Sequence, residues 1–186
     1  VIEQASDIDL IIKSSHLLGA SPLIGIRAKL SSQSSGRWSN SIGDKSKFGL
    51  SIPEILKATK RLKEANLLNE LKLLHFHLGS QINDIGVLKD ALQEAGQIYV
   101  ELINLGAPMG YLDVGGGLGI DYDGSQTASI ASTNYSLQNY ANDVVATIKE
   151  CCESKKIQLP TLITESGRAI ASHFSILIFN ILGKNS

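Results

Sequence analysis

The sequence has few of the features that mark a disulfide-stabilised or zinc-binding protein. Only 2 of its 186 residues are cysteine. Cys151 and Cys152 are neighbours in a helical pattern, where a disulfide between them would be strained and a zinc ion would lack further ligands. We therefore expect both to be reduced, structural thiols.

An excess of charge of one sign and a long apolar run are also missing. The net charge is -1 and the pI is about 6.5, so nothing predicts nucleic acid or an anionic membrane surface as a partner. The longest apolar stretch, at 174–182, is far shorter than the roughly 20 residues of a membrane-spanning helix. We expect a soluble protein with a small ligand, and we interpret this stretch as a buried strand. The sequence opens on Val1 rather than methionine, which favours a fragment of a longer protein.

What is present is an alternation of short β-rich runs with longer amphipathic ones, which is typical of βα units around a parallel sheet. Helices are predicted at about 6–19, 51–65, 84–105 and 136–153. Strands are predicted at about 22–29, 71–77, 110–114, 160–165 and 174–182. Five strands cannot close an eight-stranded barrel, so the fold is either an open sheet or the larger part of a (β/α)8 TIM barrel whose first strands lie outside the chain. We favour the incomplete barrel.

Two segments rich in Ser, Gly, Asn and Asp follow predicted strands, at 31–46 and 121–134. In a barrel they would lie at the carboxyl ends of the strands, where βα loops build active sites. Loops of this length are either functional lids or solvated insertions, and the sequence leaves both open.

Three motifs at predicted strand ends carry the chemistry: HFHLGSQ at 75–81, LDVGGGLG at 112–119 and ITESGR at 163–168. Consecutive glycines after a strand offer backbone N–H donors to a phosphate. Arg168 adds a planar cationic fork, and the Ser80 hydroxyl either donates to the same anion or caps a turn. A carboxylate does not bind phosphate, so Glu165 beside this site indicates a ligand that also has a protonatable part, such as a pyridine nitrogen. The combination describes pyridoxal phosphate.

The motifs have other interpretations. The triple glycine could simply mark a tight turn. It is not a dinucleotide-binding fingerprint, because Ile120 occupies the position of the last glycine. The sequence also contains no Walker-type nucleotide-binding motif. His75 and His77 are two apart on a strand, as in a metal-dependent hydrolase, with His173 and Asp113 as the remaining candidate ligands. His77 could also be an ordinary core histidine, or an imidazole stacked on a cofactor ring.

The ordered set FHLGSQ, DVGGGLG and ESGR resembles the fold-type III pyridoxal-phosphate decarboxylases, which have an alanine-racemase-like barrel. GIRAKL at 25–30, GDKSKFGL at 43–50 and ESGRAIASH at 165–173 are similar to the biosynthetic arginine decarboxylases among them. The resemblance implies a partial cofactor-binding (β/α) barrel over 1–173. Residues 174–186 would begin the exit segment toward a C-terminal β-domain.

The resemblance also implies roles for individual residues. His77 matches the histidine that stacks on the cofactor, and Glu165 matches the acid that pairs with the pyridine nitrogen; these two are the catalytic candidates. The residues that match the phosphate site are Ser80, Gly115, Gly116, Gly117, Gly167 and Arg168.

The implied reaction is decarboxylation of L-arginine to agmatine and CO2 in polyamine biosynthesis. Magnesium, a homodimer or homotetramer, and a location in bacterial cytoplasm or a plant plastid are implied as well. The Schiff-base lysine of the family has no match here, since Lys29 belongs to a different segment, and we expect the chain alone to be inactive. A related barrel that binds the cofactor without catalysis is the alternative.

Overall fold

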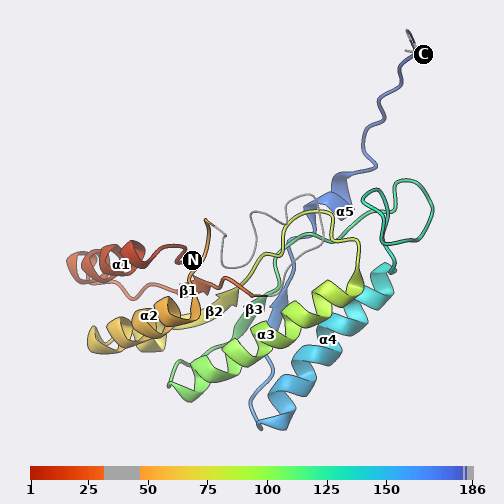
Figure 1. The fold of residues 1–186 in the computed structure, drawn as a ribbon. Coiled ribbons are helices and arrows are strands. Elements are labelled where there is room, and N and C mark those ends of the chain that lie inside the picture. The colour runs from red at the N-terminus through yellow and green to blue at the C-terminus, as the bar shows by residue number, and fades with distance from the viewer. Residues whose placement is uncertain (32–46, 182, 184–186) are drawn as a thin grey trace.

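A parallel four-stranded sheet forms the centre of the molecule (Figure 1). The computed structural model describes residues 1–31, 47–181 and 183. The strands lie in chain order: β1 (Ile24–Arg27), β2 (Leu71–His75), β3 (Tyr111–Asp113) and β4 (Thr161–Ile163). The helices are α1 (Ala5–Leu18), α2 (Ile52–Glu64), α3 (Ile85–Asn104), α4 (Leu137–Ser154) and α5 (Gly167–Ala171), with a 3-10 turn η3 (Leu68–Glu70) before β2. Parallel neighbours in sequence order are what consecutive βα units produce.

Local signals fix where the helices begin. Ser51 caps α2, and its backbone N–H donates to Glu54 Oε2 at 2.8 Å in a capping box. Asp84 caps α3 by accepting the Gly86 N–H at 2.9 Å. Ser136 caps α4 by accepting the N–H of the residue three positions on. These caps confirm the predicted helices to within a residue or two.

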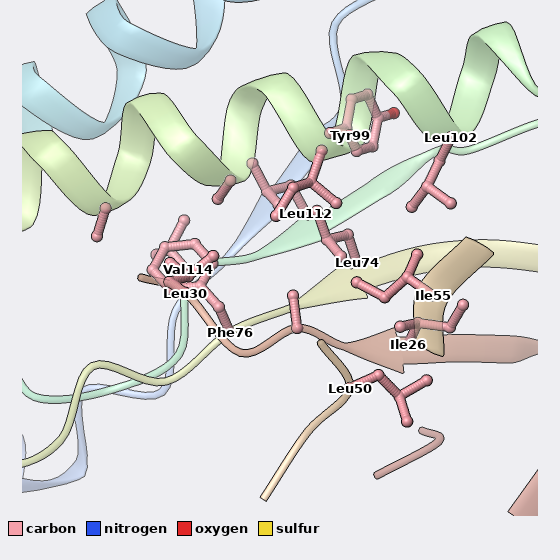
Figure 2. Close-up of a cluster of buried hydrophobic side chains, with 14 of the residues drawn as sticks. Ile26, Leu30, Leu50, Ile55, Leu74, Phe76, Tyr99, Leu102, Leu112 and Val114 are labelled. Carbon is pink, nitrogen blue, oxygen red and sulfur yellow. The ribbon is translucent and has the colours of Figure 1, made fainter. Parts of the chain in front are cut away.

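The core lies between the sheet and the helices. Leu74 of β2 and Leu112 of β3 are 0% exposed, and they point toward Tyr99 and Leu102 of α3 (Figure 2). Side chains alternate along a strand, so the next residues, His75 and Asp113, belong to the opposite face of the sheet. The apolar contact with α3 therefore fixes which face presents these polar groups.

The predicted strand at 174–182 is wrong for its described part. Residues 174–181 form no strand, and Phe174, for example, is 95% exposed. A strand is stable only when its backbone groups pair with a neighbour. After α5 the chain instead runs away from the β4 edge (Figure 1), so an apolar β-prone sequence alone did not determine the structure.

The other predicted strands are confirmed but are shorter than expected, and the sequence did not reveal α5 or η3. Of the two predicted loops, 121–134 is described, whereas residues 32–46 lie outside the described residues. Among the helices of the described ranges, none combines the length and apolarity that crossing a membrane requires.

Replacing Leu112 with alanine should destabilise the fold, because it leaves a cavity between β3 and α3. We expect Leu112→Ala to lower the free energy of unfolding by about 2–5 kcal/mol in urea denaturation. Leu10→Ala is the matched control, since Leu10 on α1 is 63% exposed and should change stability by less than about 0.5 kcal/mol. Equal effects of the two variants would contradict the assigned core.

Candidate functional site

A buried acid and a histidine meet where β2 and β3 end. His75 pairs with Asp113 in the sheet register, and His75 Nδ1 lies 2.9 Å from Asp113 Oδ2, an ion-pair contact without hydrogen-bond alignment. Asp113 Oδ1 accepts the Gly115 N–H at 2.9 Å. Burial of Asp113 opposes its ionisation, but the contacts with His75 and the Gly115 N–H outweigh burial and lower the pKa of this carboxyl. Asp113 is therefore an anion that holds the start of the glycine loop.

The glycine loop packs tightly between the ends of β2 and β4. Gly115 has φ +67, and a Cβ at Gly116 would lie 2.6 Å from the Glu165 carbonyl oxygen, so only glycine fits both positions. The Glu165 N–H donates to the Gly115 carbonyl at 2.8 Å, and the Gly116 N–H donates to His77 Nδ1 at 3.2 Å. Two of the three predicted phosphate donors, the N–H groups of Gly115 and Gly116, are thus engaged within the protein.

His77 follows β2 and borders this loop. Partial burial lowers its pKa, and the positive charge of Arg27 and the neighbouring His75 add to the effect. Because Nδ1 accepts a hydrogen bond, the neutral ring carries its proton on Nε2. The side chain stays exposed in part, so a neutral imidazole faces the space beside the glycine loop.

Arg168 forms the positive part of the site. Its Nη2 donates to Ser80 Oγ at 2.7 Å, and its Nη1 donates to Tyr122 Oη at 3.1 Å. The guanidinium is exposed and belongs to α5, directly after β4. It therefore joins segments that follow β2, β3 and β4 at the carboxyl ends of the strands.

Glu165 supplies a carboxylate to the candidate site. One oxygen of its carboxylate belongs to a group with His75 and Asp113 in which the possible ligand atoms all lie within 4.8 Å of one another. In the part of the chain that the structure describes, this is the one group of three potential metal ligands, and His77 is not a member. The group contains His75 and Asp113 of the predicted metal candidates but not His77, so the His75 and His77 pair stays a prediction.

The predicted site residues gather at one edge of the sheet, on three loops that follow β2, β3 and β4. Which of them bind a cofactor stays a prediction. The sequence analysis did not identify two residues that take part in the site, Asp113 as the acceptor of the Gly115 N–H and Tyr122 as a partner of Arg168. The role of Asp113 had a local signal, since an aspartate two residues before a glycine favours a turn closed by its side chain. Tyr122 had no local signal, because it is 46 residues from Arg168.

A parallel βα sheet that gathers a guanidinium, a carboxylate and a glycine loop at the carboxyl ends of its strands is typical of the α/β proteins that bind a ligand at this edge. Comparison with known proteins gives the family. The sequence model described as "Pyridoxal-dependent decarboxylase, pyridoxal binding domain" matches residues 1–172. The chain belongs to the pyridoxal-dependent decarboxylases.

Individual relatives agree with this assignment. The chain is 75% identical to the biosynthetic arginine decarboxylase of Prochlorococcus marinus and 72% identical to that of Parasynechococcus marenigrum, over 186 residues in each case. These alignments span 100% of the chain and 29% of each relative. The crystal structure of the biosynthetic arginine decarboxylase from Campylobacter jejuni superposes with a TM-score of 0.75 at 38% identity, covering 90% of this chain and 26% of that one. The predicted fold class, an incomplete alanine-racemase-like barrel, is confirmed.

Gly116→Ala should distort the loop, because the new Cβ would meet the backbone oxygen of Glu165 at 2.6 Å. We expect a loss of about 1–3 kcal/mol in the free energy of unfolding. Gly110→Ala serves as the control, since a Cβ there meets no atom within 4 Å. A Gly116→Ala protein as stable as the control would show that the loop is not packed as described.

The depressed pKa of Asp113 predicts a pH dependence of stability. A carboxyl whose folded pKa lies below its unfolded value stabilises the fold above the unfolded pKa, about 4, and this stabilisation is lost as the pH falls through the folded pKa. Asp113→Asn should cost about 1–3 kcal/mol at pH 7, and the difference from the unsubstituted protein should shrink below about pH 4. Urea denaturation from pH 7 to pH 2 measures it, with the exposed Asp90→Asn as control. A difference that does not change with pH would overturn the assignment of an ionised Asp113.

Proposed function

We propose that the protein to which this chain belongs decarboxylates L-arginine to agmatine and CO2 with pyridoxal phosphate. The observation that carries the proposal is the placement of the Glu165 carboxylate, just after β4, and the Arg168 guanidinium, at the start of α5, beside the glycine loop. A ligand with a phosphate at one end and a protonatable group at the other would match both. The relatives named biosynthetic arginine decarboxylase supply the substrate.

The residues fit pyridoxal phosphate. Arg168 and Ser80 bind its phosphate, with Gly167 and the glycines 115–117 leaving room for it. His77 would contact the ring. Its lowered pKa keeps the imidazole neutral near pH 7, so it would add no positive charge beside a protonated ring. When bound, the cofactor supplies a sink for the electron pair that the departing CO2 leaves behind.

Glu165 keeps the ring nitrogen protonated. An anion close to a pyridine nitrogen raises its proton affinity, and a protonated ring withdraws electrons more strongly. The His75–Asp113 pair lies beside this carboxylate. In the overall reaction the bond between the α-carbon and the carboxylate breaks, CO2 leaves, and a proton takes its place to give the amine. Glu165 and His77 are the catalytic residues in this scheme, since both touch the cofactor.

Other features of the family belong to the same proposal. They are a homodimer or homotetramer, a requirement for magnesium, and a location in bacterial cytoplasm or a plastid. Residues 1–173 form the barrel part, and 174–186 lead toward a C-terminal β-domain. The lysine that holds the cofactor comes from another part of the protein, so catalysis needs more than this chain.

The test is decarboxylation by the protein expressed at the full length of its relatives, with pyridoxal phosphate added. Arginine should release agmatine, whereas ornithine and lysine should release little amine. Glu165→Gln should lower kcat about a hundredfold and change cofactor affinity less, because the carboxylate acts on the ring's electrons. Glu153→Gln, an exposed carboxylate on α4, should leave the rate unchanged.

Two outcomes would contradict the proposal. Cofactor absorbance without amine release from any of the three substrates would favour a binding protein on the same barrel. Full activity of Glu165→Gln would remove the electron-sink role from this residue.

A further inference from the structure

Tyr122 is joined to the anion site although none of the three sequence motifs contains it. Its hydroxyl accepts a hydrogen bond from Arg168 Nη1 at 3.1 Å, while Arg168 Nη2 donates to Ser80 Oγ at 2.7 Å. The two outer nitrogens of the guanidinium are therefore each matched to one hydroxyl. The tyrosine and the serine flank the cation from different loops.

Hydrogen bonds fix the loop that carries Tyr122 beside Arg168. The Tyr122 N–H donates to the Ala131 carbonyl at 2.8 Å, and Ser132 Oγ donates to Asp121 Oδ1 at 2.6 Å, so the loop is closed on itself. Gln81 attaches its start to the segment after β2, donating to the Ile120 carbonyl at 2.6 Å and accepting the Ile120 N–H at 3.0 Å. Figure 1 shows the 121–134 loop beside α5.

The middle of the loop has a second attachment. Asn83 Nδ2 donates to the Ala128 carbonyl at 2.5 Å, and the Asn134 N–H donates to the Asn83 carbonyl at 3.0 Å. The loop therefore holds the phenol of Tyr122 at the guanidinium through contacts made elsewhere along its length. An isolated surface tyrosine would have to order itself on binding, at a cost in side-chain entropy.

The direction of these hydrogen bonds determines what the hydroxyls can do. A hydroxyl that accepts from a guanidinium keeps its own proton available for another acceptor. Tyr122 and Ser80 can therefore each donate to an anion that lies against Arg168, which supplies the charge. Since the N–H groups of Gly115 and Gly116 are engaged within the protein, such donors are what a phosphate at this edge needs.

We propose that Tyr122 binds the phosphate of pyridoxal phosphate together with Arg168 and Ser80. The 121–134 loop would thereby form one wall of the phosphate site, which is the functional interpretation of that loop. The inference rests on the proposed cofactor but not on the choice of arginine as substrate.

Titration of the full-length apoenzyme with pyridoxal phosphate, followed by absorbance and fluorescence, tests the inference. Tyr122→Phe removes one oxygen from a residue that is 51% exposed, so the variant should fold normally. We expect its apparent Kd for pyridoxal phosphate to rise about tenfold or more, the range for a hydrogen bond to a charged group. The Kd for pyridoxal, which has no phosphate, should change less than about twofold.

The matched control is Tyr111→Phe, at the amino end of β3, away from the site; its Kd for pyridoxal phosphate should equal that of the unsubstituted protein. A Tyr122→Phe protein that binds pyridoxal phosphate as tightly as the control overturns the inference and leaves the proposed function intact. An equal loss of affinity for both ligands also overturns it, because the tyrosine would then act on the ring or the fold. No cofactor binding by the unsubstituted protein would instead refute the proposed function.

Discussion

The parallel register between β2, β3 and β4 is the constraint on which the site depends. His75 pairs with Asp113, and Asp113 pairs with Ile163, so the three strands end level with one another. In an antiparallel arrangement the segments that follow these strands would leave from opposite edges. Parallel pairing brings the histidine loop, the glycine loop and the Glu165 loop to one edge. The apolar contact of Leu74 and Leu112 with α3 then fixes which face of the sheet is buried.

The ionisable groups at this edge fall into a buried pair and an exposed pair, and the two pairs have different roles. Asp113 and His75 are each 8% exposed, and their contacts are with each other and with the glycine loop. Removing one partner of such a pair leaves the other without compensation, so the pair holds the loops in place. Glu165 and Arg168 are exposed. These two retain access to a ligand, one of each sign.

The sequence alone predicted the features that depend on neighbouring residues, and it failed where contacts between distant segments decide the structure. The helices after Ser51, Asp84 and Ser136 were predictable because their caps lie within three residues of the helices they begin. The positions of the three motifs at one edge were predictable because each motif follows its own strand. The strand predicted at 174–182 failed because pairing, which the sequence of one segment does not contain, decides whether a strand forms.

The contact of Tyr122 with Arg168 could not be predicted from the sequence either, because it joins distant parts of the chain. It joins residues 46 positions apart, and the contact of Arg168 with Ser80 joins residues 88 apart. Both depend on how the loops after three different strands are anchored. Ser80 was identified beforehand because it lies inside a motif, whereas Tyr122 lies in a segment whose composition indicated only a loop.

The glycine motif predicted where the loop lies, but it did not predict which of the loop's N–H groups are already engaged within the protein. Its glycines are required by the backbone of neighbouring loops, since a Cβ at Gly115 would lie 2.2 Å from the Phe76 carbonyl oxygen. Because the three loops approach closely, the N–H groups of Gly115 and Gly116 donate to protein atoms, although the motif alone would assign them to a phosphate. With the Gly115 and Gly116 N–H groups engaged, side chains that reach the same edge from other loops become the candidate donors for an anion. Arg168 is one of them, and its guanidinium donates to two hydroxyls.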